Sequence, residues 1–143
     1  MMNPIIDHIQ ITVKDLSVAE PFYDKFLSIL GFDINRKSKG RVAKHEFDVV
    51  EYFHPLLTFG INSPRETFKE AVIHRRKPGA IHHLAFRAES RAEVDRIYQE
   101  IKEIGANIIE EPKFFPQHGE SYYAAFFKDL EGIKYEIVYE ERK

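Results

Sequence analysis

The chain has 143 residues, a formal net charge of −2 and no cysteine, so its length fits one ordinary domain or two small modules that share a core. The missing cysteines exclude disulfides, zinc–thiolate sites and thiol nucleophiles, and the small net charge gives no general attraction to nucleic acid or anionic membranes. Because residues 1–4 carry no signal-peptide pattern and no apolar run reaches the roughly 18 residues of a membrane span, we expect a soluble cytoplasmic protein without membrane or nucleic-acid partners.

The first half of the chain reads as a strand, a helix and three further strands. Alternating apolar residues predict a strand over 5–13, and Ser17 and Glu20 are spaced as in the capping box that begins a helix. Gly31 supplies the helix stop. Strand composition follows in the segments 32–34, 46–53 and 56–61, with a basic loop at 36–41.

A connector then leads to the second half. Ser63 followed by Pro64 predicts the start of a short helix, and the basic run 74–77 suits the C-terminal end of such a helix. Pro78 and Gly79 close the segment.

The second half repeats the order of the first. After a strand over 80–88, Ser90 and Glu93 form a second capping-box pattern, and Gly105 stops the helix at nearly the same interval as Gly31 does. Further strands are predicted at 106–110, 122–127 and 133–139, and an irregular loop at 111–120.

These elements predict an α+β fold built from two βαβββ modules. Module 1 covers about 1–62, the connector 63–79 and module 2 about 80–143, all within a single domain. One such module leaves a face of its sheet uncovered, so we expect the two modules to pair into a cup-shaped mixed sheet.

Strand alternation selects three candidate metal ligands. His8 lies opposite the apolar positions of the first strand, and His83 lies opposite Leu84 and Phe86, which suit packing against a helix. Glu136 lies opposite the apolar positions of the last strand. Two imidazoles and a carboxylate are typical of a facial triad that leaves open positions on a divalent ion such as Fe, Mn, Zn, Ni or Co.

Two neighbouring side chains compete with this ligand set. His82 precedes His83 and Asp7 precedes His8, so either could replace its neighbour. Their strand parity places both on the side of the sheet that packs on the helix, which favours His83 and His8 as the ligands.

The whole pattern resembles the vicinal oxygen chelate superfamily, which includes glyoxalase I, methylmalonyl-CoA epimerase, fosfomycin-resistance enzymes, extradiol dioxygenases and bleomycin-resistance proteins. The resemblance implies the glyoxalase-like fold and a metal held by His8, His83 and Glu136. The matching segments are 7–9, 13–16, 22–23 and 30–32 in the first half, and 82–86, 105–106 and 126–136 in the second.

The resemblance also implies a fourth ligand place, which we assign to Thr58. Glyoxalase I-like and epimerase-like members have Glu or Gln there, and a carboxylate in that place can act as a proton-transfer base. Threonine is a poor ligand and no base at neutral pH. The resemblance therefore implies a three-ligand pattern, closer to the fosfomycin-type or extradiol-type members than to glyoxalase I.

Three further side chains are candidates for catalysis. His118 lies in a loop that contains Gly and Pro and is a candidate acid or base, or a residue of the pocket. Tyr122 and Tyr123 are candidates for contact with a substrate through their hydroxyls, although core packing is the expected role for at least one of them.

Two functions are compatible with these residues. The first is a metal-dependent small-molecule enzyme, in which the metal chelates vicinal oxygens of the substrate; the sequence leaves lyase, isomerase, transferase and dioxygenase chemistry open. The alternative is a non-catalytic drug-sequestering protein of the bleomycin-resistance type, whose members generally lack the ligand set. The resemblance also implies a possible homodimer.

Overall fold

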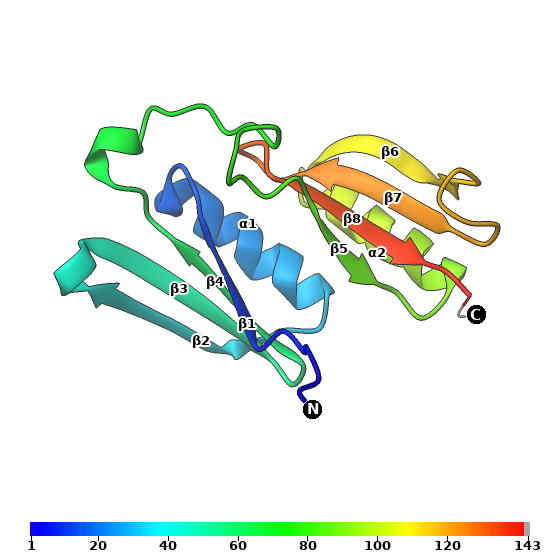
Figure 1. The fold of residues 1–143 in the computed structure, drawn as a ribbon, viewed down its shortest axis with the longest axis horizontal. Helices are drawn as coiled ribbons and strands as arrows, with labels where there is room; N and C mark the ends of the chain where they lie inside the picture. The colour runs from blue at the N-terminus through cyan, green and yellow to red at the C-terminus, as the bar shows by residue number, and fades with distance from the viewer. Residues whose placement is uncertain (142–143) are drawn as a thin grey trace. The chain divides into compact units, whose positions relative to one another are not determined.

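The computed structural model describes residues 1–141 and contains two compact units. The first unit covers Met1–Val72 and the second begins at Ile73, inside the stretch predicted as the connector (Figure 1). Each unit contains one α-helix and one four-stranded sheet. No helix in the described range 1–141 is both long and apolar enough to cross a membrane.

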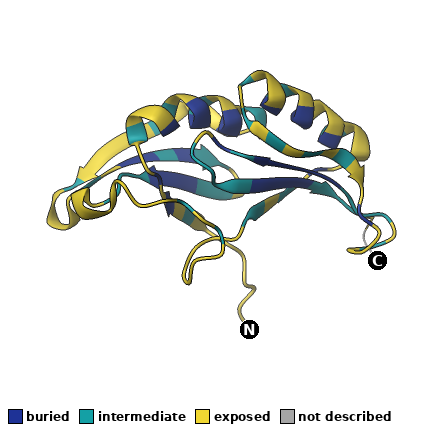
Figure 2. Ribbon diagram, turned by 90° about the horizontal axis from the view of Figure 1, so that it is seen from above, coloured by how far each residue is buried: buried dark blue, intermediate teal, exposed yellow. Residues whose placement is uncertain are grey.

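The first unit has the strand order β1-β4-β3-β2, with β1 and β4 parallel and the other pairs antiparallel. Its helix buries Ala19, Phe22, Tyr23, Phe26 and Leu27, and buried residues lie on the helix side that faces the sheet (Figure 2). A 3-10 turn, η1 (Ala43–His45), precedes β3. The elements are β1 (His8–Thr12), α1 (Leu16–Ile29), β2 (Asp33–Val42), β3 (Phe47–His54) and β4 (Leu57–Asn62).

Helix α1 begins earlier than the sequence predicted. Asp15, not Ser17, is the N-cap: Oδ1 of Asp15 accepts hydrogen bonds from the backbone N–H and the hydroxyl of Ser17, at 2.9 and 2.6 Å. Aspartate and serine both cap helices well, and in this helix the side chain of Asp15 is the one that binds a free backbone amide. The predicted stop is confirmed, because Gly31 has the positive φ of +97° that glycine adopts readily.

The basic loop predicted at 36–41 is wrong, because these residues lie inside the ten-residue strand β2. Lys37 turns back to α1, where its ammonium donates to Glu20 at 2.8 Å and to Asp24 at 3.1 Å. Lys37 and Lys39 of this segment therefore form ion pairs with the helix, whereas Arg41 pairs with Asp48 of β3. The backbone of the segment pairs with β3.

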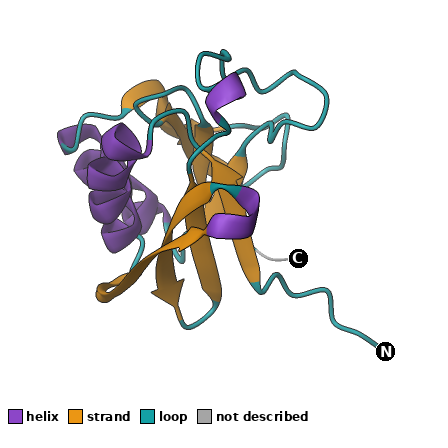
Figure 3. Cartoon of the chain, turned by 90° about the vertical axis from the view of Figure 1, so that its left-hand side faces the viewer, coloured by secondary structure: helices purple, strands orange, loops and turns teal. Residues whose placement is uncertain are grey.

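The predicted connector helix is also wrong. Only a single 3-10 turn, η2 (Glu66–Phe68), forms there, and the basic run 74–77 is irregular (Figure 3). The segment exposes Phe68 and Val72. A lone short helix without a buried apolar face has little stability, because helices in proteins depend on tertiary packing.

The second unit repeats the topology, with the strand order β5-β8-β7-β6 and a parallel pair β5–β8. Ser90 caps its helix as predicted, accepting from the backbone N–H of Glu93 at 3.0 Å, and Gly105 follows the helix with φ +92°. The helix buries Val94, Ile97, Tyr98 and Ile101. The elements are β5 (Leu84–Arg87), α2 (Arg91–Glu103), β6 (Asn107–Phe114), β7 (Tyr123–Lys128) and β8 (Lys134–Tyr139).

The predicted fold class is confirmed: the chain is α+β and contains two βαβββ modules, each with a four-stranded mixed sheet. The largest remaining differences concern three strand boundaries, the first being β1, which begins at His8 rather than at residue 5. Strand β5 begins at Leu84 rather than at residue 80, and β6 extends to Phe114, into the loop predicted at 111–120.

Candidate metal centre

The carboxyl group of Glu136 is the buried acidic group of the β8 strand, with 2% of the residue exposed. A turn fixes its position: Oδ1 of the buried Asp129 accepts hydrogen bonds from the backbone N–H groups of Glu131, Gly132 and Ile133. The turn feeds directly into β8, whose register sets Glu136 opposite Ala85 on one side and Phe126 on the other. A buried carboxylate requires partners, since an unpaired buried charge is costly.

His83 is one of those partners. Its Nε2 lies 3.2 Å from Oε1 of Glu136, and its ring packs edge-on against Phe126 at 6.2 Å between centroids. His83 stands one residue before β5. The structure therefore brings together two of the three predicted ligands, both of them in the second unit.

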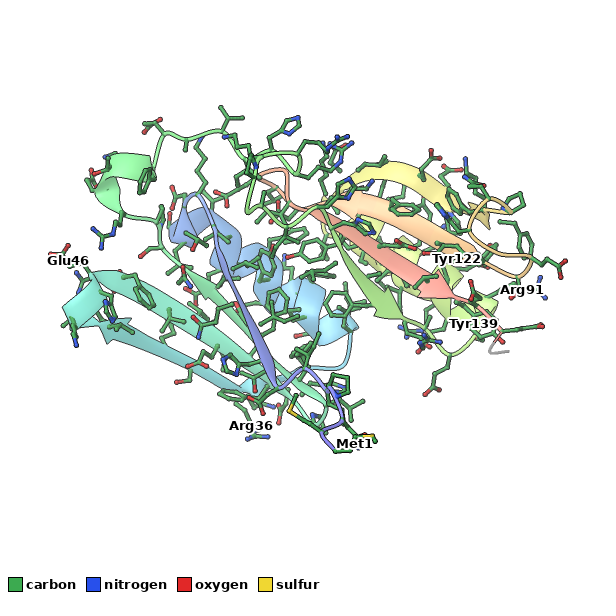
Figure 4. All side chains as sticks on the ribbon, in the orientation of Figure 1. Met1, Arg36, Glu46, Arg91, Tyr122 and Tyr139 are labelled. Atoms are coloured by element: carbon green, nitrogen blue, oxygen red, sulfur yellow. The ribbon has the colours of Figure 1, made fainter. Side chains whose placement is uncertain are left out.

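Tyr122 is the second partner of Glu136. Its hydroxyl donates a hydrogen bond to Oε2, the carboxylate oxygen that does not face His83. Burial and this hydrogen bond raise the pKa of Tyr122, so the phenol stays protonated and remains a donor at neutral pH. Tyr122 lies beside β7 and β8 (Figure 4). The two oxygens of Glu136 thus have different partners, which fixes the orientation of the carboxylate.

His82 does not pack toward the helix, in contrast to its predicted parity. It is exposed, and its Nδ1 lies 2.7 Å from Nδ1 of His83. Alternation fails for His82 because β5 begins only at Leu84, so His82 lies outside the regular strand. Loss of solvation and the positive charges of His83, Arg75 and Lys134 lower the pKa of His82, which favours a neutral ring that can accept a hydrogen bond.

His8 and Asp7 form a similar contact in the first unit. Nδ1 of His8 lies 2.8 Å from Oδ2 of Asp7, and both side chains are exposed. A carboxylate that accepts from Nδ1 holds the imidazole in the tautomer whose Nε2 carries a free lone pair. This contact is compatible with the prediction that His8, rather than Asp7, is the ligand, and the assignment stays a prediction.

The contact between His83 and Glu136 is compatible with two ligands of a divalent metal. The Nδ1 atoms of His8 and His83 both have hydrogen-bonding partners, so in each case Nε2 is the atom left for a metal. The 3.2 Å between Nε2 of His83 and Oε1 of Glu136 matches two adjacent ligands with bonds of about 2.1 Å, which lie about 3 Å apart. Within the described part of the chain, no three His, Cys, Asp or Glu side chains gather around one point.

The candidate catalytic residues separate into two groups. The exposed ring of His118 lies 5.2 Å from the ring of Tyr122 and stacks on Phe115, so His118 stands beside the Tyr122–Glu136 pair. Tyr123 instead donates its hydroxyl to Asp95 of α2 at 2.7 Å. Its hydroxyl is therefore directed toward the helix and away from Glu136.

By strand register, the residue of the first unit that corresponds to Glu136 is Gly60 rather than Thr58. In the second unit the residue two after His83, Ala85, pairs with Glu136 on the parallel neighbour. In the first unit the residue two after His8 is Gln10, and it pairs with Gly60. Gly60, which has no side chain, is therefore the counterpart of Glu136, whereas Thr58 pairs with His8 itself.

Sequence reasoning assigned no role to two basic neighbours of this centre. Lys134 lies two residues before Glu136, with its ammonium 4.9 Å from the centre of the Phe126 ring. Burial and the charge of Arg75 lower the pKa of Lys134. The spacing of Lys134 from Glu136 was a usable signal, since residues two apart share a strand face. The approach of Arg75 depends on the irregular course of the connector and has no such signal.

Comparison with known proteins gives a consistent picture. The family model described as the Glyoxalase/Bleomycin resistance protein/Dioxygenase superfamily matches residues 5–137. The uncharacterized protein YqjT of Bacillus subtilis is 30% identical over 133 residues, which cover 92% of this chain and 95% of YqjT.

Two solved structures illustrate the similarity in fold. A glyoxalase/bleomycin resistance protein from Albidiferax ferrireducens is 25% identical, with a TM-score of 0.70 over 94% of this chain and 98% of its own. The fosfomycin resistance protein FosX from Listeria monocytogenes, solved in complex with Mn(II) and sulfate ion, is 18% identical, with a TM-score of 0.64 over 98% of this chain and 95% of its own.

Proposed function

The chain belongs to the Glyoxalase/Bleomycin resistance protein/Dioxygenase superfamily, and from that premise we propose that it is a metal-dependent enzyme acting on a small molecule. His83 and Glu136 hold a divalent first-row metal in this proposal. His8, in the first unit, is the third ligand that the sequence predicts, and it stays a prediction. FosX, which shares the fold, was solved with Mn(II), which supports an ion of this class.

One observation carries the proposal: the buried Glu136 directs one oxygen at Nε2 of His83, while its other oxygen is held by Tyr122. A purely structural ion pair would not need the second imidazole that contacts Nδ1 of His83. The arrangement fixes one nitrogen and one oxygen as adjacent donors, which is how proteins prepare ligands for a metal.

The chemistry assigned to this chain divides between the metal and the side chains. When bound, the metal polarises oxygens of the substrate and stabilises negative charge that develops on them. Tyr122 holds the carboxylate of Glu136 in place and prevents its rotation. His118 moves a proton between its imidazole and the substrate, a role for which its exposed ring beside Tyr122 is suited.

Metal analysis of the purified full-length protein tests the proposal. His83→Ala and Glu136→Gln should each lower bound Mn(II) from near stoichiometric to below a tenth, because each removes a ligand. His74→Ala and Glu110→Gln are the matched controls: both residues lie in the same unit, and their side chains bind elsewhere, His74 to the backbone of Arg76 and Glu110 to Lys113. Stoichiometric metal in both ligand variants would refute the site.

The second candidate is a binding protein that sequesters a drug without catalysis. Its support is Gly60, which leaves the first unit without the counterpart of Glu136 and so reduces the ligand set. Titration of metal-free protein with an aromatic glycopeptide drug such as bleomycin separates the two functions. If the protein binds the drug tightly, and neither added metal nor the Glu136→Gln substitution changes the affinity, the result would favour sequestration over catalysis.

A further inference from the structure

An open hollow of about 400 Å³ lies within the first unit, and none of its lining residues belongs to the candidate metal centre. The lining comes from η1, from the start of β3, from the ends of β1 and β4, and from the segment that leads through η2 (Figure 1). Thr12 and Asn62, which pair across β1 and β4, place the hollow on the same sheet face as His8. Its volume lies in the usual range of small-molecule sites.

Two phenylalanine rings of this hollow are left without an aromatic or cationic neighbour. Phe47, the first residue of β3, is half-buried, and Phe68, the last residue of η2, is 60% exposed. Within residues 1–141 neither ring lies against another ring or a cation. The other ten of the twelve phenylalanines each do. Both free rings therefore line one hollow, where a flat apolar group can pack on them.

The polar part of the hollow supplies hydrogen-bond donors, and its described lining residues include no acid. Arg65 contributes an exposed guanidinium, and His45 contributes a ring nitrogen. The hydroxyl of Ser63 accepts from the backbone N–H of Asp48 at 2.9 Å, which leaves its own hydrogen free to donate. The carboxylate of Asp48 pairs with Arg41 at 3.0 Å. These donors are suited to the oxygens of an anion.

A hollow in the second unit shows what distinguishes this one. Arg91 lines that second hollow, but its guanidinium already lies over the ring of Phe114, at 5.4 Å from the centroid. Asp95 and Glu141 line it as well and oppose the entry of an anion. In the first unit, by contrast, Arg65 shares a hollow with two free rings and no lining carboxylate.

The backbone beside the first hollow is strained. Glu46 has φ 59° and ψ 45°, and among residues 1–141 it is the one non-glycine residue with a positive φ; Figure 4 marks it at the turn between β2 and β3. A left-handed conformation is costly for glutamate, and such strain is typical of functional sites. The turn carries His45 and Phe47, on either side of Glu46, into one hollow.

We propose that this hollow binds an aromatic acid, with the ring system of the ligand against Phe47 and Phe68 and its carboxylate on Arg65 and Ser63. A planar guanidinium can bind both oxygens of a carboxylate, so Arg65 selects the charge of the ligand. The two phenylalanines select its flat apolar part. The inference goes beyond the proposed function, because it depends on neither Glu136 nor a bound metal.

Calorimetric titration of the full-length protein with three probes tests the site. Naphthoate carries both the rings and the charge, naphthamide lacks the charge, and acetate lacks the rings. Naphthoate should bind at least about tenfold more tightly than either of the others. Arg65→Gln should weaken naphthoate about tenfold, as expected for loss of a charge-assisted hydrogen bond, and leave naphthamide unchanged. Phe68→Ala should weaken both aromatic probes about threefold to tenfold.

Matched controls come from the hollow of the second unit. Arg91→Gln and Phe114→Ala remove an exposed arginine and an exposed phenylalanine there, and neither should change the affinity for naphthoate. Equal losses in Arg65→Gln and Arg91→Gln would overturn the proposal. So would equal affinity of the wild type for naphthoate and naphthamide, or no binding of any probe.

Two further measurements separate the site from the metal centre and from the fold. Glu136→Gln should bind naphthoate as the wild type does, and a loss as large as in Arg65→Gln would assign the probe to the metal centre and overturn the proposal. Because Arg65 and Phe68 are exposed, both variants should unfold at the wild-type temperature. If Phe68→Ala unfolds earlier, the contrast between naphthoate and naphthamide in Arg65→Gln decides the test.

Discussion

Gln10 lies across Gly60 on the neighbouring parallel strand, and a Cβ added at Gly60 would come 2.9 Å from Cγ of Gln10. The amide of Gln10 is held there by Asn62, which donates to its Oε1 at 3.3 Å. The first unit therefore fills, with a neutral amide, the place that corresponds to the carboxylate of Glu136. The absence of a side chain at Gly60 is what allows this.

The pairing of Gln10 with Gly60 suggests a double variant that places a carboxylate at position 60. In Gln10→Ala/Gly60→Glu, the smaller residue 10 makes room and the new glutamate occupies the counterpart of Glu136. In the proposal that His8 of the first unit completes the metal site, affinity for Mn(II) should rise by ~10-fold, because added ligand charge strengthens binding of a hard divalent ion. Competition with a fluorescent chelator measures the change.

Gly40→Glu is the control for this variant. It adds the same charge to the first unit at a glycine where an added Cβ would meet nothing within 4 Å. Equal affinities for the two glutamate variants would mean that Gly60 does not face the metal, and would remove the basis for treating it as a ligand place.

Removal of the Tyr122 hydroxyl is expected to loosen Glu136. Tyr122→Phe should lower metal affinity by about 10- to 100-fold, the usual effect of losing a hydrogen bond to a ligand, and reduce the free energy of unfolding by about 1–3 kcal/mol. Tyr123→Phe removes the equivalent hydroxyl from the helix side, where it bonds Asp95, and should leave metal affinity unchanged. Parallel losses in both variants would contradict the assigned role.

The raised pKa of Tyr122 also predicts a pH dependence. A group whose pKa is raised on folding contributes stability that is fully present below its ordinary pKa of about 10 and is lost as the pH rises through the folded value. The difference in unfolding free energy between wild type and Tyr122→Phe should therefore stay constant from pH 7 to 9 and shrink above pH 10. Urea unfolding at each pH measures it; a difference that grows above pH 10 would contradict this sign.

His82 is expected to act through His83. Replacing it by phenylalanine removes the partner of Nδ1, so the imidazole of His83 can rotate or change tautomer. Metal affinity should fall about 10-fold in His82→Phe, with the unfolding temperature unchanged because His82 is exposed. His82→Asn, which keeps a short hydrogen-bonding side chain, should recover part of the loss. An affinity equal to wild type in His82→Phe would remove His82 from the centre.

The parts of the structure that sequence predicted well depend on local signals. The helix stops at Gly31 and Gly105 and the cap at Ser90 are decided within a few residues, so the order βαβββ could be predicted twice. Strand parity placed His83 and Glu136 on the face away from the helix, and the structure brings the two side chains together.

The parts that sequence did not predict depend on register and on distant partners. Strand alternation predicts that Thr58 and Gly60 lie on the same face of β4, but it does not predict which residue of β1 each one pairs with. A shift of two residues between these parallel strands would exchange the two partners and leave both residues on the same face. The basic segment of β2 looked like a loop because the acids of α1 that neutralise Lys37 lie far away in sequence. His82 was misplaced because parity was extended beyond the true start of β5.

An ion-pair cluster between α1 and β2 gives a prediction for the first unit. Lys37 is 22% exposed and joins Glu20 and Asp24, and the hydroxyl of Tyr52 donates to Asp24 at 2.8 Å. Burial opposes the charge on Glu20, but hydrogen bonds from Lys37 and Lys39 outweigh it and lower the pKa of Glu20. The hydrogen bond from Lys37 to Glu20 in turn raises the pKa of Lys37, against a smaller effect of burial.

Lys37→Met should therefore reduce the free energy of unfolding by about 1 kcal/mol at neutral pH, the range for a charged hydrogen bond that is only partly screened. The loss should shrink as the pH falls through the lowered pKa of Glu20, below the ordinary glutamate value of about 4.3, and as the pH rises through the raised pKa of Lys37, above the ordinary lysine value of about 10.4. Lys69→Met breaks a solvent-exposed pair with Glu66 and should leave the free energy of unfolding unchanged at any pH, because solvent screens such a pair. Urea unfolding of both variants from pH 3 to pH 11 measures the contrast. A Lys37→Met deficit as large at pH 3 as at pH 7 would show that the side chain acts through packing rather than charge.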